Sequence, residues 1–294
     1  MTRTVLVTGA TGTVGRHVLN ALADRRGDVR AGLRDPETAP STAPASADVV
    51  AFDFEKPETW GPALAGVDVI FLVRPPTVDA GDVAAFAEAA DRVGVDHIAY
   101  LSTLGAERHV LVPHHRIEKR IVATDAAHTL LRASFFMQNL LEVHRPDIVD
   151  RDEIFVPAGD GQTSFVDARD LGEIAAIVLT EPGHESRAYD LTGPDAIDYE
   201  TVAAVFSDVL DRRITYPNPS LWAFGVRMRR RGHSLGFILL MCGIYTTARL
   251  GLADRVTRDS HRILGRPPRD MHTFVEDHAD AFGTDGDAIV DSDG

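Results

Sequence analysis

The chain has 294 residues, of which 44% are hydrophobic and 25% charged, and its formal net charge at pH 7 is −14. This length predicts one large α/β domain, or a large domain with a small appendage, and it can bury a core without metals or disulfides. So acidic a chain is a poor candidate for nucleic-acid binding. Its single cysteine, Cys242, excludes an internal disulfide, and no Cys/His cluster has zinc spacing. We therefore expect no metal site and a reducing compartment.

Two further features bear on where the protein works. The N-terminus lacks the basic flank and cleavage site of a signal peptide, and the longest apolar run, Leu235 to Tyr245, is too short to span a bilayer. We predict a cytoplasmic protein without stable membrane insertion. Among its 30 Lys and Arg residues only Lys56 and Lys119 are lysines. This usage indicates either a halophilic-type acidic surface or simply a GC-rich genome.

The first half of the chain alternates short apolar runs with helical stretches. Strands are expected at Thr4–Thr8, Val29–Leu33, Val49–Phe52, Val67–Val73, His97–Ser102 and Thr129–Arg132. Helices are expected between them at Val14–Arg26, Glu58–Leu64, Asp79–Val93 and Pro113–Thr124. The alternation predicts the α/β class, with a doubly wound parallel sheet of the Rossmann type covered by helices on both faces.

The second half is less regular. Strands are expected at Ile154–Val156, Thr163–Val166 and Ala188–Leu191, with a turn at Gly159–Gly161, and helices at Thr201–Leu210, Leu221–Arg230 and Leu235–Arg249. Asp170 is expected to cap a further helix. We predict a Rossmann domain over residues 1–150, to which 166–193 return. Residues 151–165 and 194–283 would form a smaller C-terminal α/β substrate domain, and 284–294 an acidic disordered tail.

The first strand runs directly into a glycine-rich turn that opens a helix. This turn comprises Gly9, Ala10, Thr11, Gly12, Thr13, Val14 and Gly15. Gly9 permits a tight turn, Gly12 lets a pyrophosphate approach the backbone, and Gly15 lets the helix pack close to the strand. The N–H groups of Thr11 to Val14 would point at the phosphates, with the helix dipole behind them. The spacing differs from the standard G-x-G-x-x-G, but its strand–turn–helix setting predicts dinucleotide binding.

The end of the second strand bears on which dinucleotide binds. An arginine at this place, here Arg34, can hold the 2′-phosphate of NADP, whereas an acidic residue would bind the ribose hydroxyls of NAD. We favour NADP(H) over NAD(H). Asp35 follows immediately, however, and NAD is expected if Asp35 faces the ribose. Arg34 would otherwise be a solvated charge at a strand end.

The ends of the third and fourth strands supply further cofactor-binding candidates. Asp53 and Phe54 can accept from and flank the adenine, or else they are a helix-leading acid and a core phenylalanine. Val73, Arg74 and Pro75 close the fourth strand, at the edge where a parallel sheet presents its ligand. The Pro-Pro pair that follows the arginine restricts the backbone there.

Three residues farther along have a suggestive spacing. Ser102 ends the fifth strand, His115 follows thirteen residues later, and Lys119 four after that. His115 and Lys119 share a helix face at this spacing. The pattern resembles short-chain dehydrogenases, which carry serine, tyrosine and lysine at these intervals, with histidine in the tyrosine position.

The chain resembles more closely the NmrA-like group of atypical short-chain dehydrogenases. The motifs that carry this resemblance are GATGTVGRHV, DHIAYLSTLGAE, HHRIEKRI, HTLLRASFFMQNL, SFVDARDLGEIAAIVLTEPGHE and YDLTGPDAIDYETVA. The resemblance extends from residue 4 to about 280. Ala133 departs from the pattern, because the family usually has proline after the Leu-Arg pair, and it leaves the loop before Phe135 less constrained.

The resemblance implies a Rossmann domain, a smaller substrate domain and a cleft between them with NAD(P)H at its floor. Some members of the family reduce quinones, dyes or other conjugated acceptors, and others act as non-catalytic sensors of the NADP(H) state. By resemblance, the catalytic candidates are Ser102, His115 and Lys119, of which Ser102 and Lys119 would also touch the cofactor. Phe135, Phe136 and Asn139 would line the nicotinamide side, unless they are ordinary helix-start packing.

The histidine in the tyrosine position bears on the chemistry. His115 can donate a proton, but a neighbouring Lys119 ammonium would disfavour the protonated ring and weaken it as an acid. Positioning, packing or solvent contact is its alternative role, and His114 competes for any of these. In a chain that otherwise uses arginine, lysine at 119 favours a compact ammonium on the nicotinamide ribose. The alternative for Ser102 is an ordinary strand-end hydroxyl.

Two expected helices of the C-terminal part carry large apolar residues and a basic run. Trp222, Phe224, Met228, Phe237, Met241 and Tyr245 can wall an apolar pocket over the cofactor or form a helix–helix core. The run from Arg227 to His233 can contact an anionic ligand, a partner or a membrane face, or it is a solvated helix end.

A quinone-like acceptor needs less of an acid than a carbonyl does, so loss of the tyrosine favours such acceptors. We therefore expect an oxidoreductase that transfers hydride from NADPH to a quinone-like or other conjugated small molecule. The alternative is a non-catalytic, NADP(H)-sensing regulatory protein with a protein partner. A scaffold that binds no nucleotide is a third interpretation.

Overall fold

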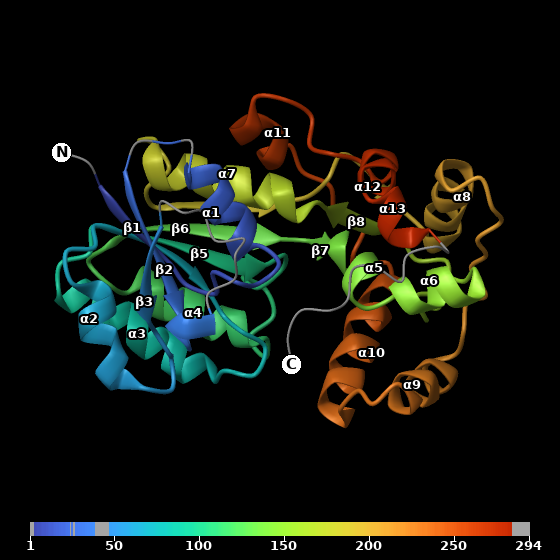
Figure 1. Ribbon diagram of the computed structural model, residues 1–294, viewed down its shortest axis with the longest axis horizontal. Coiled ribbons are helices and arrows are strands. Elements are labelled where there is room, and N and C mark those ends of the chain that lie inside the picture. Colours follow the sequence, from blue (N-terminus) through green and yellow to red (C-terminus); the bar gives the residue numbers. More distant parts are fainter. Residues whose placement is uncertain (1–2, 24, 26, 39–46, 284–294) are drawn as a thin grey trace. The chain divides into compact units, whose positions relative to one another are not determined.

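The computed structural model describes residues 3–23, 25, 27–38 and 47–283, and it divides into two compact units (Figure 1). Unit 1 comprises Met1–Ser134, Ala168–Leu191 and Arg258–Pro267. Unit 2 comprises Phe135–Asp167, Thr192–Thr257 and Pro268–Gly294. This division differs from the predicted boundary at residue 150, because the chain enters unit 2 already at Phe135. The predicted tail, 284–294, lies outside the described residues.

Unit 1 is built on a seven-stranded sheet in which all neighbouring strands are parallel. Its strands are β1 (Thr4–Val7), β2 (Asp28–Leu33), β3 (Ala47–Ala51), β4 (Val69–Val73), β5 (His97–Thr103), β6 (Ala127–Ala133) and β9 (Arg187–Leu191). Their order is β3-β2-β1-β4-β5-β6-β9, so the direction of winding reverses between β1 and β4. Ligands of such sheets bind at this reversal, beyond the carboxyl ends of the strands. The predicted Rossmann-type α/β class is confirmed.

Helices cover both faces of this sheet (Figure 1). On one face α1 (Gly15–Ala23) packs against α7 (Ala168–Thr180), and on the other α3 (Ala80–Arg92) packs against α4 (Pro113–Val122). The other helical elements of unit 1 are η1 (Pro36–Thr38), η2 (Pro57–Thr59), α2 (Trp60–Leu64) and α11 (Asp259–Leu264). Because both faces are covered, the central strands β4 and β5 are buried along most of their length. Their near-continuous apolar sequence follows from this burial.

Ion pairs join the segment that contains α11 to helix α7 of unit 1. Arg266 donates to the buried Asp170 (Nη2 to Oδ1, 2.9 Å) and to Glu173 (2.7 Å), both on α7. Because α7 begins at Ala168, Asp170 lies inside its first turn, and the prediction that Asp170 caps the helix is wrong.

Unit 2 combines a small sheet with seven helices in the part of it that the structure describes. Its strands β7 (Phe135–Phe136), β8 (Thr163–Val166) and β10 (Ala196–Ile197) have the order β10-β8-β7. The helices are α5 (Gln138–Glu142), α6 (Arg145–Arg151), α8 (Tyr199–Val209), α9 (Leu221–Arg230), α10 (Leu235–Arg249), α12 (Met271–Asp277) and α13 (Ala279–Phe282). The predicted strand Ile154–Val156 does not form, because the only pairing near it is an isolated bridge between Glu153 and Thr215.

Four of these helices begin at a side-chain cap. Just before α8, α9, α10 and α12, a side-chain oxygen accepts a hydrogen bond from a backbone N–H of the first helical turn; the capping residues are Asp198, Ser220, Ser234 and Asp270. Each cap satisfies an amide that has no partner within the helix. The chain therefore encodes the starts of these helices locally.

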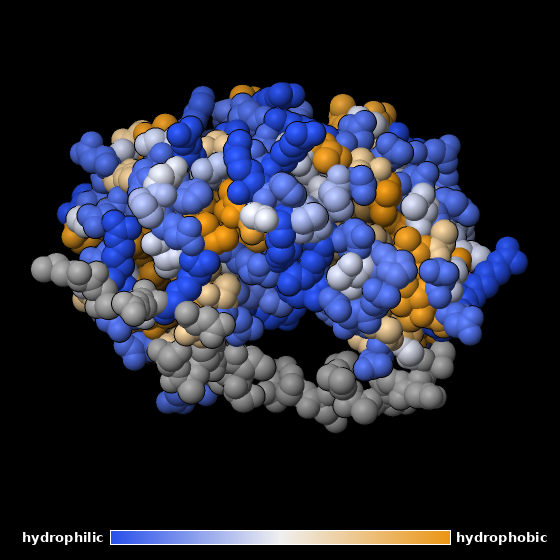
Figure 2. All heavy atoms as spheres, turned by 90° about the horizontal axis from the view of Figure 1, so that it is seen from above, coloured by the Kyte–Doolittle hydropathy of each residue, from blue (hydrophilic) through white to orange (hydrophobic). Residues whose placement is uncertain are grey.

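The surface is mostly hydrophilic on the face that Figure 2 presents, with smaller hydrophobic patches between the hydrophilic residues. Among the described residues, no helix is long and apolar enough to cross a membrane.

Candidate functional site

The glycine turn between β1 and α1 has a backbone that side chains would disrupt. Gly9 has φ +58°, and a Cβ atom there would come within 2.4 Å of Val73 Cγ1. A Cβ atom on Gly15 would lie 2.0 Å from the Gly9 carbonyl oxygen. The Gly12 amide donates to that same oxygen at 2.9 Å. Gly9 therefore has the left-handed turn expected of it and Gly15 the tight start of the helix, whereas the approach of a pyrophosphate to Gly12 stays a prediction.

This turn leaves donors and a helix dipole facing outward. Thr11 and Gly12 are exposed, and the amides of Thr11 and Val14 have no acceptor among the described residues. The first turn of α1 holds no acidic side chain that would neutralise the positive end of the dipole. An exposed glycine backbone in front of a helix start fits a pyrophosphate.

Hydrogen bonds join the end of β4 to Thr8, the residue that precedes the glycine turn. The Val73 amide donates to Thr8 Oγ1 at 3.0 Å, and Thr8 Oγ1 donates to the Phe71 carbonyl oxygen at 3.1 Å. Beyond it Arg74 Nη2 donates to the Pro76 carbonyl oxygen at 3.2 Å, and the Val78 amide donates to that of Pro75 at 3.1 Å. The structure thus brings the predicted residues Val73, Arg74 and Pro75 to the edge that holds the glycine turn.

Arg34 and Asp35, the two residues that compete for the ribose, are both exposed just beyond β2. The Asp35 carboxylate accepts from the Glu37 amide at 3.1 Å, which is a local turn at the start of η1. Arg34 makes no hydrogen bond or ion pair with another described residue. This arrangement leaves the guanidinium available to a phosphate, and residues 39–46, which follow η1, lie outside the described part.

Asp53 and Phe54 behave differently from each other. Asp53 Oδ1 accepts from the Glu55 amide at 3.0 Å, and the side chain is 14% exposed, so its carboxylate lies near the surface beyond β3. Phe54 is 4% exposed and packs edge-on against Phe52 (4.8 Å between ring centroids) and Phe86 (5.6 Å). The ring of Phe54 belongs to the core, as the alternative held, and does not flank an adenine.

Ser102 has a partner that the sequence did not indicate. Its hydroxyl donates to Glu118 Oε1 at 2.6 Å, and Arg132 donates to both oxygens of the same carboxylate, at 3.0 and 2.7 Å. The hydrogen bond with Glu118 raises the pKa of the Arg132 guanidinium. All three side chains are largely buried, so the network fixes α4 against β5 and β6. The structure does not pair Ser102 with His115 or Lys119.

Tyr100 and His114 form a second pair between β5 and α4. The Tyr100 hydroxyl lies 2.7 Å from His114 Nδ1. Burial lowers the pKa of His114 to about 4, and the nearby Arg74 guanidinium acts in the same direction. Burial also raises the pKa of Tyr100. Both groups are therefore neutral at pH 7 and share one hydrogen bond.

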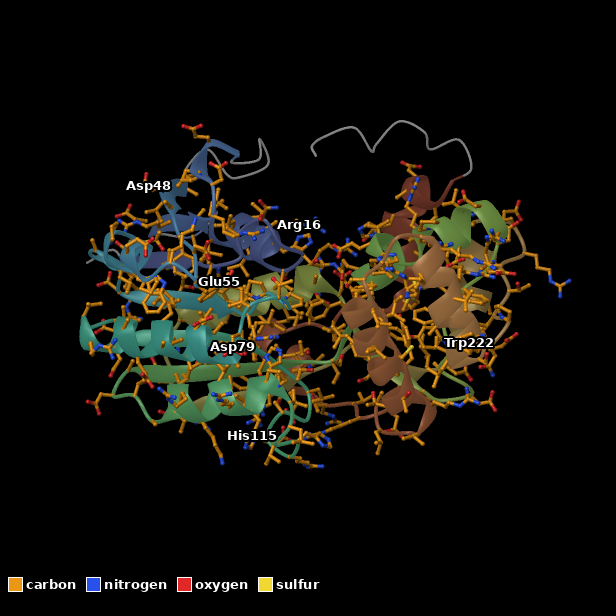
Figure 3. The ribbon with its side chains drawn as sticks, turned by 90° about the horizontal axis from the view of Figure 1, so that it is seen from below. Arg16, Asp48, Glu55, Asp79, His115 and Trp222 are labelled. Atoms are coloured by element: carbon orange, nitrogen blue, oxygen red, sulfur yellow. The ribbon has the colours of Figure 1, made fainter. Side chains whose placement is uncertain are left out.

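His115 and Lys119 lie on α4, and Figure 3 labels His115 there. His115 Nδ1 lies 2.8 Å from the Ala106 carbonyl oxygen, so this nitrogen is the one that carries the proton. In the neutral ring Nε2 is then an acceptor, and it has no partner within the described residues. Lys119 is exposed and forms no ion pair with another described residue. Its ammonium is free to bind a ligand.

Phe135, Phe136 and Asn139 belong to unit 2. Phe135 lies edge-on to Phe165 (5.7 Å) and near Tyr245 (5.8 Å) in an aromatic core. The Asn139 carbonyl oxygen accepts from the Val143 and His144 amides. The helix-packing interpretation therefore accounts for these contacts, and a nicotinamide contact for Phe135 stays a prediction.

The apolar residues of α9 and α10 mostly form core, as the alternative interpretation held. Phe224, Met228, Met241 and Tyr245 are at most 5% exposed. Trp222, by contrast, is 81% exposed (Figure 3), and the Phe237 ring stacks on His233. The predicted apolar pocket is not formed by these side chains, because their burial serves the packing of unit 2.

The basic run between α9 and α10 separates into two groups. Arg227 and Arg231 both donate to the fully buried Asp147, at 2.8 and 2.6 Å, and Arg227 also donates to Glu153 at 2.7 Å. Arg227 further lies over the Phe155 ring, 3.2 Å from its centroid. Arg229 and Arg230 are exposed. Two of the four arginines in the run are thus ion-paired internally. Spacing alone does not reveal this, because Asp147 is distant in sequence.

Sequence reasoning missed Glu118 and Arg132. The available signal was weak: Glu118 precedes the predicted Lys119 and lies on the apolar face of α4 with Ile117 and Ile121. A carboxylate on a buried helix face requires a partner, and only the fold shows that Arg132 of β6 supplies it.

Several known proteins to which this chain is similar are reductases. The model of the NmrA-like family matches residues 1–221. The NAD(P)H azoreductase of Xenophilus azovorans is 32% identical over 95% of this chain and 99% of its own. The Citrobacter sp. triphenylmethane reductase complexed with NADP(H) superposes with a TM-score of 0.83 at 26% identity, covering 92% of this chain and 98% of its own.

The Escherichia coli NADPH-dependent quinone oxidoreductase complexed with NADPH also has a TM-score of 0.83, at 26% identity over 93% of this chain and 99% of its own. The family match spans most of the chain, and these likenesses extend over nearly all of it. The chain therefore belongs to the NmrA-like family.

Proposed function

We propose that this protein is a nicotinamide-dependent oxidoreductase that reduces quinone-like or dye acceptors at the expense of NADPH. The glycine turn carries the proposal, because its backbone, its exposed amides and the uncompensated dipole of α1 fit a pyrophosphate. The likeness to an azoreductase, a triphenylmethane reductase and a quinone oxidoreductase supports conjugated acceptors rather than simple carbonyls.

Several described residues would hold the cofactor. The backbone from Gly9 to Gly15 would bind the pyrophosphate, and Arg34, with no partner among the described residues, would bind the 2′-phosphate and select NADP. Asp53 would lie at the adenine side and Val73, Arg74 and Pro75 at the β4 edge. The exposed Lys119 ammonium would bind the nicotinamide ribose. Contacts from Ser102 and Phe135 stay predictions.

Bound NADPH would supply a hydride, which brings a quinone two electrons and one hydrogen, and one proton taken up from the medium would complete the hydroquinone. His115 directs its Nδ1–H to the Ala106 carbonyl oxygen, so that proton is not presented to an acceptor. Solvent serves as the proton source, which suffices for acceptors whose reduced form spreads its charge over a conjugated system.

Lys119 tests this assignment with a matched control. We expect Lys119→Gln to raise the KM for NADPH about tenfold through loss of a charge-assisted hydrogen bond. Arg116→Gln removes an exposed charge from the same helix and should change nothing. Oxidation of NADPH with a panel of quinones, azo dyes and aldehydes is the assay, with NADPH affinity measured separately by titration.

The outcomes separate the two functions. Turnover with quinones or dyes but not aldehydes supports the reductase. Tight NADPH binding without turnover of any acceptor contradicts it and favours the NADP(H)-sensing alternative. The predicted cytoplasmic location and salt-adapted surface stay predictions.

A further inference from the structure

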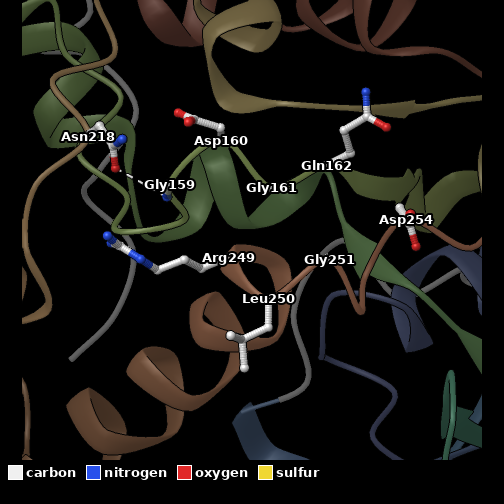
Figure 4. Close-up of a pocket in the computed structure, with 9 residues that line it drawn as sticks. All are labelled: Gly159, Asp160, Gly161, Gln162, Asn218, Arg249, Leu250, Gly251 and Asp254. Carbon is white, nitrogen blue, oxygen red and sulfur yellow. Dashed lines mark hydrogen bonds between the residues drawn. The ribbon is translucent and has the colours of Figure 1, made fainter.

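Unit 2 contains a polar cavity that the proposed reductase chemistry does not use (Figure 4). Its volume is about 640 Å³, within the range of small-molecule sites. The walls are the turn Gly159–Gln162, Asn218, and the end of α10 with the loop that follows it. All of these residues belong to unit 2.

The turn that forms one wall is fixed in place by glycines. Gly159 has φ +64°, and a Cβ atom on it would lie 3.0 Å from Arg249 Cγ. A Cβ atom on Gly161 would lie 1.9 Å from the carbonyl oxygen of Ala248. The turn therefore lies directly on the last residues of α10. A side chain at position 161 would force the two walls apart.

One end of the cavity presents hydrogen-bond donors. Asn218 Oδ1 accepts from the Gly159 amide at 3.1 Å and from the Tyr216 hydroxyl at 3.2 Å, so its carbonyl is used and its NH₂ group remains for a ligand. Burial raises the pKa of Tyr216 to about 12, and the hydroxyl stays a donor. Figure 4 shows the Arg249 guanidinium reaching toward Asn218. Arg249 makes no ion pair or hydrogen bond with another described residue.

A guanidinium and an amide NH₂ group that line the same cavity can recognise an acid, because both present only donors. Other arginines of unit 2 are paired with carboxylates, as Arg227 and Arg231 are with Asp147. Arg249 is instead held at the cavity wall, where the aliphatic part of its side chain packs on Gly159. A carboxylate or sulfonate of a ligand would complete this end.

The cavity walls also present acceptors. Asp160 and Asp254 contribute two exposed carboxylates, and Gln162 an amide. These carboxylates repel a second negative charge and accept from hydroxyl or amino groups. The cavity thus presents acceptors as well as donors.

We propose that this cavity binds a small organic acid that also carries a hydroxyl or amino group. The acid would pair with Arg249 and Asn218, and the hydroxyl or amino group would donate to Asp254 or Asp160. The proposal does not depend on the reductase activity, since binding can be measured without NADPH or turnover.

Binding of 4-hydroxybenzoate to the full-length protein, followed by calorimetry or ligand-observed NMR, tests the site. The uncharged 4-hydroxybenzamide should bind about tenfold more weakly, and benzoate, which lacks the hydroxyl, should also bind more weakly. Arg249→Gln should weaken 4-hydroxybenzoate binding about tenfold, while Arg230→Gln, an equal change of charge on exposed α9, should not. No binding, equal binding of acid and amide, or an unaffected R249Q variant would each overturn the proposal.

A steady-state arm identifies the source of the acid. If the acid is part of the acceptor, R249Q raises the KM for a carboxylated quinone and leaves that for its uncharged analogue unchanged. If the acid is a separate effector, both KM values stay unchanged while 4-hydroxybenzoate binding is lost. Either result supports the site. Absence of all turnover would count against the proposed reductase alone, because the binding experiment is unaffected.

Discussion

Each unit of the protein contains a glycine turn that a single methyl group would disrupt, but the two turns pack on different partners. In unit 1 the Cβ of Gly15 would meet the carbonyl oxygen of Gly9, within the same turn. In unit 2 the Cβ of Gly161 would meet the carbonyl oxygen of Ala248, at the end of a helix far along the chain. The first turn is determined locally, whereas the second exists only through tertiary packing. We expect a change in the first turn to act on NADPH binding, and a change in the second to act on the stability of unit 2.

The largest effect is expected from a substitution in the glycine turn of unit 1. Gly15→Ala forces the start of α1 away from Gly9, and we expect the Kd for NADPH to rise about a hundredfold, since overpacking against backbone costs about 3 kcal/mol. Titration of NADPH measures it. Gly61→Ala is the matched control, because a Cβ atom there meets nothing within 4 Å. Unchanged NADPH affinity in G15A would show that this turn is not the pyrophosphate site.

The corresponding change in unit 2 should act on stability instead. Gly161→Ala should lower the free energy of unfolding by about 2 kcal/mol, because neither the turn nor the α10 carbonyl can yield easily. Urea denaturation measures this, and the Kd for NADPH should stay unchanged. Gly243→Ala within α10, whose Cβ also meets nothing within 4 Å, should be neutral or slightly stabilising. A loss of NADPH affinity in G161A with normal stability would contradict the distinction between the turns.

Cofactor selection should depend on the β2 end near the first turn. We expect Arg34→Gln to reduce the preference for NADPH over NADH about tenfold, through loss of a charge-assisted bond to the 2′-phosphate. The ratio of kcat/KM for the two cofactors measures it. Asp35→Asn serves as the comparison, because its carboxylate bonds the Glu37 amide. If D35N shifts the preference and R34Q does not, the NAD assignment is the correct one.

The smallest effect concerns pH. Burial lowers the pKa of His97, His114 and His144 to about 4, the first two in unit 1 and the third in unit 2. Between pH 6.5 and 4 the unfolded chain binds protons that the folded chain does not, so stability falls as pH falls through this window. At pH 5.5 each histidine should cost about 1 kcal/mol relative to pH 7.

His144→Gln isolates the contribution of unit 2. The loss of unfolding free energy between pH 7 and pH 5.5, measured in urea at each pH, should be about 1 kcal/mol smaller in this variant than in the wild type. His184→Gln, which changes a histidine that is not fully buried, is the control. Equal losses in the H144Q variant and the wild type would mean that His144 is not kept neutral by burial.

The same division explains what the sequence could and could not predict. The sheet, its helices and the glycine turn follow from local patterns, and these predictions are confirmed. The placement of Phe54 was ambiguous, because the face on which a strand-end residue lies depends on what packs there. The Ser102–Glu118–Arg132 network and the Asp147–Arg227 pair join residues that are distant in sequence. Periodicity does not encode such pairings. The serine–tyrosine–lysine spacing of short-chain dehydrogenases does not include Glu118, so comparison with that pattern does not indicate its role.

The late position of β9 has a consequence for synthesis on the ribosome. β6 pairs with β9 on its outer side, from Thr129–Arg187 to Ala133–Leu191. The chain makes β6, then the Phe135–Asp167 segment of unit 2 and then α7, before it reaches Arg187. The nascent sheet thus keeps an open edge at β6 throughout this interval, and such edges associate with other chains. Truncation before Arg187 should yield a protein that aggregates through β6, and neither unit can be produced from one uninterrupted stretch of the gene.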